Sequence, residues 1–258
     1  MAGPAISDVY RLVSLDSVDS TNQEIKRRAG QGAVEGTLVW AREQTAGRGR
    51  RGRAWTSPPG NLYCSLLLRP GYAAAKALQV GFVTAVAVGD AVAAMLPDDA
   101  VVTCKWPNDV LVGGRKIAGI LIESSSAGMG SLDWLAIGVG INVALHPTGG
   151  EGQYPATSLA AEGSAAGVGV EAVLQAYGGS LQRCMTLWHD HGFAAIRAAW
   201  LQRAHGLGRP ITVRLEGESL HGVFADLDEN GALVLSRDGR RRLITFGDVF
   251  PASAAANA

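Results

Sequence analysis

Four apolar, β-branched runs follow one another between residues 100 and 145, with turn signals rather than helices between them. They read "AVVTCKW", "VLVGG", "RKIAGILIESS" and "WLAIGVGINVAL", and Pro-Asn and Gly-Gly pairs break them. Branched side chains pack well on a pleated surface, whereas Gly and Pro-Asn favour tight turns. Because the strands cluster without regular alternation with helices, the sequence predicts an α+β fold rather than a doubly wound parallel sheet.

The rest of the first 207 residues extends this pattern. Further strands are predicted at Leu12–Leu15, in "GTLVWARE" (36–43) and in "LYCSLLLR" (62–69). One helix is expected from Ser20, which we predict to cap it together with Gln23, to Gly30. Longer helical patterns cover residues 78–96, 170–189 and 192–205. The segment 78–96 is apolar enough to resemble a membrane span, but it contains Asp90, which favours a core helix.

After Gly208 and Pro210 the pattern changes to short stretches of alternating apolar and polar residues, with turns at Asn-Gly and Asp-Gly. This change predicts a small all-β module. The expected organisation is a larger domain at 1–207, a β domain at 208–252 and a frayed, alanine-rich tail at 253–258.

Charge and cysteine content exclude several classes of protein. The 23 basic and 23 acidic side chains balance, which argues against bulk binding to nucleic acid or to a membrane surface. The three cysteines are few and scattered, which argues against a disulfide framework and favours a reducing cytoplasm. The start "MAGPAISDVYRL" lacks the features of a signal peptide, so we expect a cytoplasmic protein.

The stretch "GRGRRGRAW" (47–55) concentrates positive charge in this neutral chain. Its glycines allow close backbone approach, and its arginines carry forked donors that match phosphate or carboxylate oxygens. A solvated basic loop and a nucleic-acid contact are the alternatives. The usual nucleotide motifs are missing from the sequence: no P-loop occurs, and "GVGINV" (138–143) has Val143 where a dinucleotide fingerprint needs its third glycine. No metal-ligand spacing and no serine-hydrolase elbow occur either.

These motifs together resemble the biotin–protein ligases. "STN" (20–22), Gln44, "GRGRRGRAW", "KWPNDV" (105–110), "RKIAGILIE" (115–123) and "GVGINV" appear in the order and at the spacings of that family. The resemblance extends from about residue 14 to 160 and more weakly through the C-terminal β module. It implies a mixed-sheet catalytic domain of the biotin/lipoate ligase type with a small C-terminal SH3-like β-barrel domain.

The resemblance also implies a reaction. ATP would activate the biotin carboxylate to biotinyl-5′-AMP, and a lysine of a carboxylase biotin carrier domain would then take the biotinyl group. Biotin and ATP would be substrates, and Mg²⁺ would enter with ATP. Family members that also repress transcription carry an N-terminal DNA-binding domain, whereas here the catalytic segment begins almost at residue 1, so we expect a monofunctional ligase without that domain. A homodimer is compatible with the resemblance.

Site residues follow from the matched motifs. Lys116 and Arg50 are the expected catalytic cations, because positive charge must gather where a carboxylate meets a triphosphate. Arg51 and Arg53 are alternatively anchors of the loop. Asp109 is expected to hold a turn or to help organise magnesium, and Trp55 and Trp106 to pack. Tyr154 is a candidate for stacking on adenine. The predicted biotin site contains Ser20, Thr21, Asn22, Gln44, Arg48, Gly49, Arg50, Lys116, Gly138 and Gly140. The predicted nucleotide site contains Arg48, Arg50, Arg53, Lys116 and Asn142.

Two other functions remain open at this point. A lipoate–protein ligase shares the fold and the adenylation chemistry, although the arginine loop and the C-terminal module argue against it. A DNA-binding regulator would use the basic loop as its contact, and its binding would fall steeply with salt.

Overall fold

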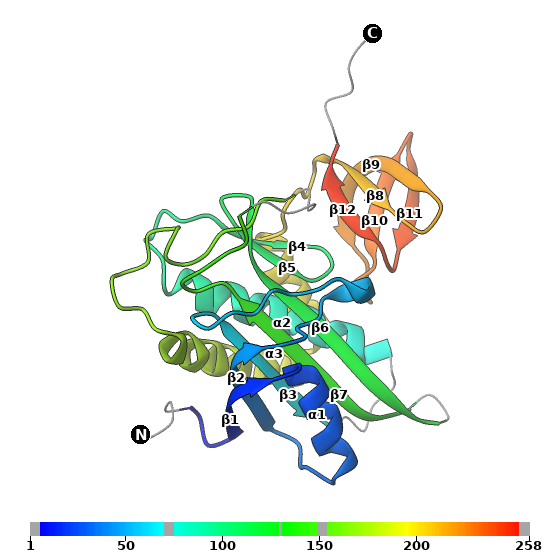
Figure 1. Cartoon of the computed structure of the whole chain (residues 1–258). Helices are drawn as coiled ribbons and strands as arrows, with labels where there is room; N and C mark the ends of the chain where they lie inside the picture. Colours follow the sequence, from blue (N-terminus) through cyan, green and yellow to red (C-terminus); the bar gives the residue numbers. More distant parts are fainter. Residues whose placement is uncertain (1–5, 70–74, 129–130, 149–153, 253–258) are drawn as a thin grey trace.

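The computed structural model describes residues 6–69, 75–128, 131–148 and 154–252. Their strands form a seven-stranded sheet in the order β1-β2-β3-β7-β6-β5-β4 and a separate five-stranded sheet (Figure 1). β1 pairs in parallel with β2, and the other neighbours in the larger sheet are antiparallel, so this sheet is mixed. Its strands are β1 (Arg11–Val18), β2 (Thr37–Gln44), β3 (Leu62–Leu68), β4 (Val102–Lys105), β5 (Asp109–Val112), β6 (Arg115–Gly128) and β7 (Ser131–Ile141). The predicted α+β class is confirmed.

Helices cover both faces of the larger sheet. α1 (Thr21–Gly30) lies on one face, and α2 (Ala75–Ala93) and α3 (Val170–Gln202) lie on the other (Figure 1). β3 is buried along its whole length: Leu62 and Leu66 enter the main core, and Leu67 packs with Ile25 of α1. A strand buried on both faces explains why its sequence is a continuous apolar run rather than an alternating one.

The start of α1 corrects one expectation. Ser20 is the N-cap residue, as predicted, but its side chain makes no capping hydrogen bond. Its backbone N–H instead donates to the neighbouring carboxylate oxygen Asp19 Oδ1 at 2.7 Å. The Ser20 side chain is buried and lines the cavity described below, so the cavity, and not the helix end, is what it faces.

α2 is the helix that resembled a membrane span. The stretch Lys76–Ala93 is long and apolar enough by composition to cross a membrane, but 67% of it is buried within the protein. Asp90, which argued for a core helix, pairs with Arg203 at 2.6 Å. The helix therefore belongs to the core, as predicted.

α3 contains the two helices expected after residue 170. Its backbone leaves the helical conformation at Gly192, where φ is 72°. Positive φ costs little for glycine because it has no Cβ, so the chain can kink there. The second part carries Trp200, whose ring lies 5.5 Å from that of Phe82 in α2 and 6.3 Å from that of Phe224 in the C-terminal module. The apolar core thus continues from the larger sheet into the module.

The C-terminal module is antiparallel, in the order β11-β10-β9-β8-β12. Its strands are β8 (Pro210–Arg214), β9 (Ser219–Leu227), β10 (Leu233–Arg237), β11 (Arg240–Ile244) and β12 (Asp248–Pro251). Asp238 and Gly239 both have positive φ, as a two-residue hairpin turn needs. The β9–β10 turn docks on the larger domain, where Trp106 Nε1 donates to Gly231 O at 3.1 Å. The tail predicted at 253–258 lies outside the described residues.

Candidate active site

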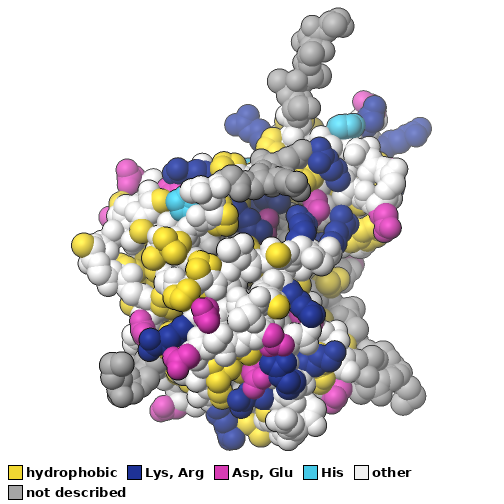
Figure 2. Space-filling view, viewed as in Figure 1, with side chains coloured by type: hydrophobic (Ala, Val, Ile, Leu, Met, Phe, Trp, Pro, Cys, Tyr) yellow, Lys and Arg dark blue, Asp and Glu magenta, His cyan; other side chains and the backbone are white. Residues whose placement is uncertain are grey.

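A cavity of about 660 Å³ opens where the start of α1, the loop after β2, the ends of β4 to β7 and the C-terminal module meet. Figure 2 shows Lys and Arg side chains gathered beside the module. Every residue predicted for the site lines this cavity. They are Ser20, Thr21, Asn22, Gln44, Arg48, Gly49, Arg50, Arg53, Asp109, Lys116, Gly138, Gly140 and Asn142.

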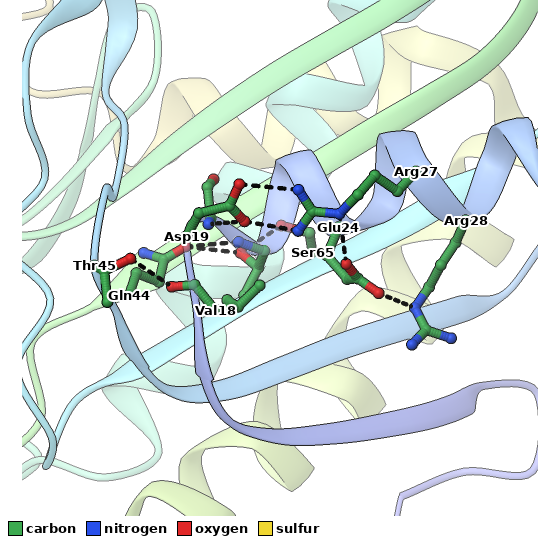
Figure 3. A network of polar contacts seen from close by, with 10 residues as sticks. Val18, Asp19, Glu24, Arg27, Arg28, Gln44, Thr45 and Ser65 are labelled. Carbon is green, nitrogen blue, oxygen red and sulfur yellow. Dashed lines mark hydrogen bonds and ion pairs between the residues drawn. The ribbon is translucent and has the colours of Figure 1, made fainter.

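Neutral polar side chains line one part of the cavity, which we call the base and which consists of Ser20, Thr21, Asn22 and Gln44. Gln44, at the end of β2, accepts a hydrogen bond through Oε1 from the backbone N–H of Thr21 at 2.8 Å, and the Thr21 hydroxyl oxygen lies 3.1 Å from the same atom. Gln44 Nε2 donates to Ser57 Oγ at 2.9 Å. Figure 3 shows Gln44 and Ser65 beside the start of α1. Because β1 and β2 pair in parallel with Val18 opposite Gln44, the start of α1, which follows β1, lies beside the end of β2.

A second part of the lining, which we call the rim, consists of Arg50, Lys105, Asp109, Lys116 and Asp248, and in it two lysines surround one carboxylate. Asp109 Oδ1 lies 2.7 Å from Lys116 Nζ, and Asp109 Oδ2 lies 3.3 Å from Lys105 Nζ. Burial acts to raise the pKa of Asp109, but the two lysines outweigh it and hold that pKa below its usual value. Burial lowers the pKa of Lys105, which the Asp109 carboxylate partly offsets. Asp109 therefore stays ionised and keeps two cations close together.

The backbone fixes Lys116 on two sides. It pairs with Leu111 across the hairpin that Gly113 and Gly114 close. Its N–H also donates to Pro155 O at 2.8 Å, and its carbonyl accepts from Thr157 N at 2.9 Å. A short turn with positive φ at both glycines thus sets the side chain at the cavity wall.

The arginine loop leans on the C-terminal module. Asp248, the first residue of β12, pairs with Arg53 at 3.1 Å, with Arg51 at 3.5 Å and with Arg50 at 4.0 Å. Arg50 Nη1 also donates to Asn108 Oδ1 at 2.9 Å. Burial lowers the pKa of Arg50, and Asp248 opposes that effect. The loop is closed on itself, because Gly49 N donates to Arg53 O and Trp55 N donates to Gly47 O.

Two predicted glycines make room for protein side chains. A Cβ at position 138 would overlap the Asn22 amide oxygen, and one at position 140 would overlap the Trp55 indole. Trp55, interpreted from the sequence as a packing residue, lines the cavity, and its ring lies 5.3 Å from Lys116 Nζ. Asn142 is buried, and its Nδ2 donates to Thr157 O at 2.8 Å. The ligand contacts assigned to Gly138, Gly140 and Asn142 stay predictions.

Aromatic rings flank Lys105 at the rim. Its Nζ lies 4.8 Å from the centre of the Tyr154 ring and 5.9 Å from that of Phe250 in β12. Burial raises the pKa of Tyr154 to about 12, so its hydroxyl is neutral at pH 7. Both rings line the cavity, which keeps Tyr154 a candidate for stacking on adenine.

Two residues of the module, Asp248 and Phe250, line the cavity and were absent from the predicted site. They lie about 200 positions after the arginine loop, so no local motif joins them to it. The available signal was the excess of arginines in the loop, which needs a carboxylate partner somewhere in the fold. Among the described residues, no group of three or more His, Cys, Asp or Glu side chains could hold a metal ion. Asp109 is instead engaged by both lysines.

Comparisons with known proteins agree over most of the chain. The biotin/lipoate A/B protein ligase family matches residues 14–142, and the biotin protein ligase C-terminal domain matches residues 206–250. A biotin–[acetyl-CoA-carboxylase] ligase of Paracoccus denitrificans is 42% identical over 239 residues, which cover 92% of this chain and 98% of the relative. The bifunctional ligase/repressor BirA of Escherichia coli is 31% identical, with 87% and 69% covered.

A solved structure gives the same result in three dimensions. The biotin protein ligase of Aquifex aeolicus in complex with biotin and ATP superimposes with a TM-score of 0.76 at 28% identity, covering 93% of this chain and 97% of that one. The family models, the sequence relatives and the shared architecture all agree, and the chain belongs to the biotin/lipoate A/B protein ligase family.

Proposed function

We propose that this protein activates biotin with ATP to biotinyl-5′-AMP and transfers the biotinyl group to a lysine of a carboxylase biotin carrier domain. The observation that carries this proposal is a single cavity with a neutral hydrogen-bonding base and a cationic rim. The base suits an uncharged polar ring, and the rim suits a carboxylate meeting a triphosphate. The named relative acts on acetyl-CoA carboxylase, and the solved relative binds biotin and ATP.

In the first step, a carboxylate oxygen of biotin attacks the α-phosphorus of ATP. The bond from that phosphorus to the bridging oxygen breaks, and pyrophosphate leaves. Lys116 and Arg50 place two cations at the rim, where they offset the repulsion between the reacting anions. In the second step, the carrier amine attacks the carbonyl carbon of the mixed anhydride, AMP leaves, and the amine loses a proton as the amide forms. Neither step needs a covalent bond to the enzyme.

Magnesium enters this proposal as the ion that ATP carries. Both oxygens of Asp109 pair with lysines, so the phosphates would hold the ion, and Asp109 would position Lys105 and Lys116 beside those phosphates. We further place the protein in the cytoplasm. All three cysteines are free and buried, and burial raises the pKa of Cys64 and Cys104 to about 12, as suits thiols kept reduced. Homodimer formation and the lack of a DNA-binding domain stay predictions.

One assay tests the function. The full chain is incubated with ATP, labelled biotin or labelled lipoate, and a biotin carrier domain, and the label on the carrier is followed. We expect biotin label, dependent on ATP and on the carrier lysine. Transfer of lipoate but not biotin would replace the proposal with lipoate ligation, and no transfer of either would contradict it.

A further inference from the structure

A chain of hydrogen bonds, buried at Ser65 and part-buried at Glu123, leads away from the base of the cavity. Ser65 on β3 is fully buried, and its Oγ lies 2.7 Å from Thr21 Oγ1 and 2.6 Å from Asn22 Oδ1. Asn22 Nδ2 donates to Glu123 Oε2 at 2.7 Å and to Leu121 O at 3.3 Å. Four side chains from α1, β3 and β6 thus connect Glu123 to Thr21, and Figure 3 shows Ser65 beside the start of α1.

Counting protons fixes the direction of this chain. Both N–H groups of the Asn22 amide are in use, so Asn22 Oδ1 can only accept. The single Ser65 proton must therefore go to Asn22 Oδ1, across the shorter of its two contacts. The remaining 2.7 Å contact then needs the Thr21 proton, so Thr21 Oγ1 donates to Ser65 Oγ. In this arrangement a proton lies between the two oxygens of each of the two contacts at 2.6 and 2.7 Å. Only the 3.1 Å contact between Thr21 Oγ1 and Gln44 Oε1 has no proton between its oxygens.

Glu123 is what prevents the opposite direction. If the Asn22 amide were turned over, its oxygen would face the carboxylate of Glu123, and two acceptors would repel each other. Gly138 supports the same placement, since any side chain there would overlap the Asn22 amide. The carboxylate therefore orients Asn22, Asn22 orients the Ser65 hydroxyl, and Ser65 takes the proton of Thr21.

We propose that Glu123 is a positioning residue for substrate specificity: acting through Asn22 and Ser65, it makes Thr21 Oγ1 a hydrogen-bond acceptor toward the cavity. This inference rests on the proposed function, and it names the feature of the substrate that is read. With its proton given to Ser65, Thr21 Oγ1 presents lone pairs to the cavity that it lines. The group that satisfies it is an N–H donor.

A hydrogen-bond acceptor at the base would distinguish biotin from lipoate. The bicyclic ring of biotin carries ureido N–H groups, whereas the dithiolane ring of lipoate carries no N–H. A lipoyl group at the base would leave a buried acceptor unpaired, and a site built to bind a donor rejects an analogue that lacks it far more strongly than an apolar pocket would. Glu123, which does not line the cavity, would thereby select biotin.

The test compares ligands as well as variants. The full chain, Glu123→Gln and Ser65→Ala are titrated by calorimetry with biotin and with biotin methylated on either ureido nitrogen. In the wild type, one methylated isomer should bind at least about 10-fold more weakly than biotin, because Thr21 Oγ1 loses its donor. Glu123→Gln can donate to Asn22 and lets the amide turn over, so it should weaken biotin binding about 10-fold and reduce the penalty for methylation to under about 3-fold.

Controls separate this role from a loss of structure. Glu24→Gln removes a carboxylate from α1, where it pairs with Arg27 and Arg28, and should leave both affinities unchanged. Ser180→Ala removes a buried hydroxyl away from the cavity. If Glu123→Gln does not fold, Ser65→Ala must give the same reduced penalty. Equal weakening of biotin and its methylated form, or no weakening, overturns the proposal. A wild type that binds no biotin contradicts the proposed function instead.

Discussion

The base and the rim of the cavity differ in charge and in exposure to solvent. The base is neutral and mostly buried, and the proton assignment argued above gives its hydrogen bonds one direction each. The rim gathers Lys105, Lys116 and Arg50 around Asp109 and Asp248, and several of these side chains remain partly exposed. Hydrogen-bonding groups with fixed directions can recognise the shape of a ligand and the position of its donor. A group of cations, in contrast, attracts any anion of suitable size. Mutations at the base should therefore change which substrate binds, and mutations at the rim should change what happens to it.

The largest effect is expected from Asp109→Asn, which removes the carboxylate that two rim lysines share. Lys105 would then be a buried cation beside Lys116 without a counter-charge, and breaking a buried pair in this way costs about 3–5 kcal/mol. Urea unfolding at pH 7 measures the loss in free energy of unfolding. An equal stability of variant and wild type would show that the carboxylate does not hold the rim together.

The same substitution has a defined pH dependence. The pKa of Asp109 in the folded protein is lower than its usual value of 3.8, so the stability it contributes is present above pH 3.8 and is lost as the pH falls through the lowered pKa. The difference between wild type and Asp109→Asn should accordingly be full at pH 7 and shrink only below pH 3.8. A difference that is constant down to pH 2 would contradict this assignment.

The next largest effect is expected from Lys116→Ala, a rim substitution that leaves the base intact. Removing one donor aimed at developing charge costs about 10²–10³ in rate. Pyrophosphate release should fall by that factor, while the affinity for biotin changes little. Arg42→Ala, which removes an exposed cation paired with Asp16, is the matched control. Pyrophosphate release at the wild-type rate would remove Lys116 from the reaction.

Arg50→Ala should affect the intermediate more than the substrate. A hydrogen bond to a charged group is worth about 1.5–3 kcal/mol, so the variant should retain biotinyl-adenylate about 10- to 100-fold less tightly. Adenylate that escapes would label exposed lysines of bystander proteins, which mass spectrometry detects. Biotin alone should bind nearly as in the wild type. If the variant holds the adenylate as firmly as the wild type, the arginine loop does not clamp it.

The contrast between base and rim also explains what the sequence could predict. The residues predicted for the site lie in short motifs, and all of them line one cavity, whereas Lys105 and Ser65 were not predicted as site residues. Asp248 and Phe250 escaped prediction because the module reaches the loop only through tertiary packing. Glu123 lies within "RKIAGILIE", but its bond to Asn22 depends on sheet register and on the space at Gly138. Ser20 is the N-cap residue, as predicted, but the expected side-chain capping bond does not form, and its buried side chain lines the cavity instead.

The smallest effect is expected from Asp248→Asn, which tests how the rim is held when no ligand is present. Asp248 pairs with three arginines, of which Arg51 and Arg53 are well exposed, and exposed pairs contribute only about 0.2–1 kcal/mol each. The variant should therefore open its loop about 2- to 5-fold more often, measured as faster trypsin cleavage after Arg48 to Arg53. Asp16→Asn, at an exposed pair outside the cavity, is the matched control.

The dependence on salt shows whether the ion pairs cause the difference: screening weakens exposed pairs, so the cleavage rates of wild type and variant should converge at about 1 M salt. The affinity for biotin should be the same in wild type and variant at every salt concentration, since none of the hydrogen bonds given above for the base involves Asp248. A variant whose cleavage rate equals that of the wild type at low salt would mean that the loop holds its own shape, and that the rim, like the base, is built without help from the C-terminal module.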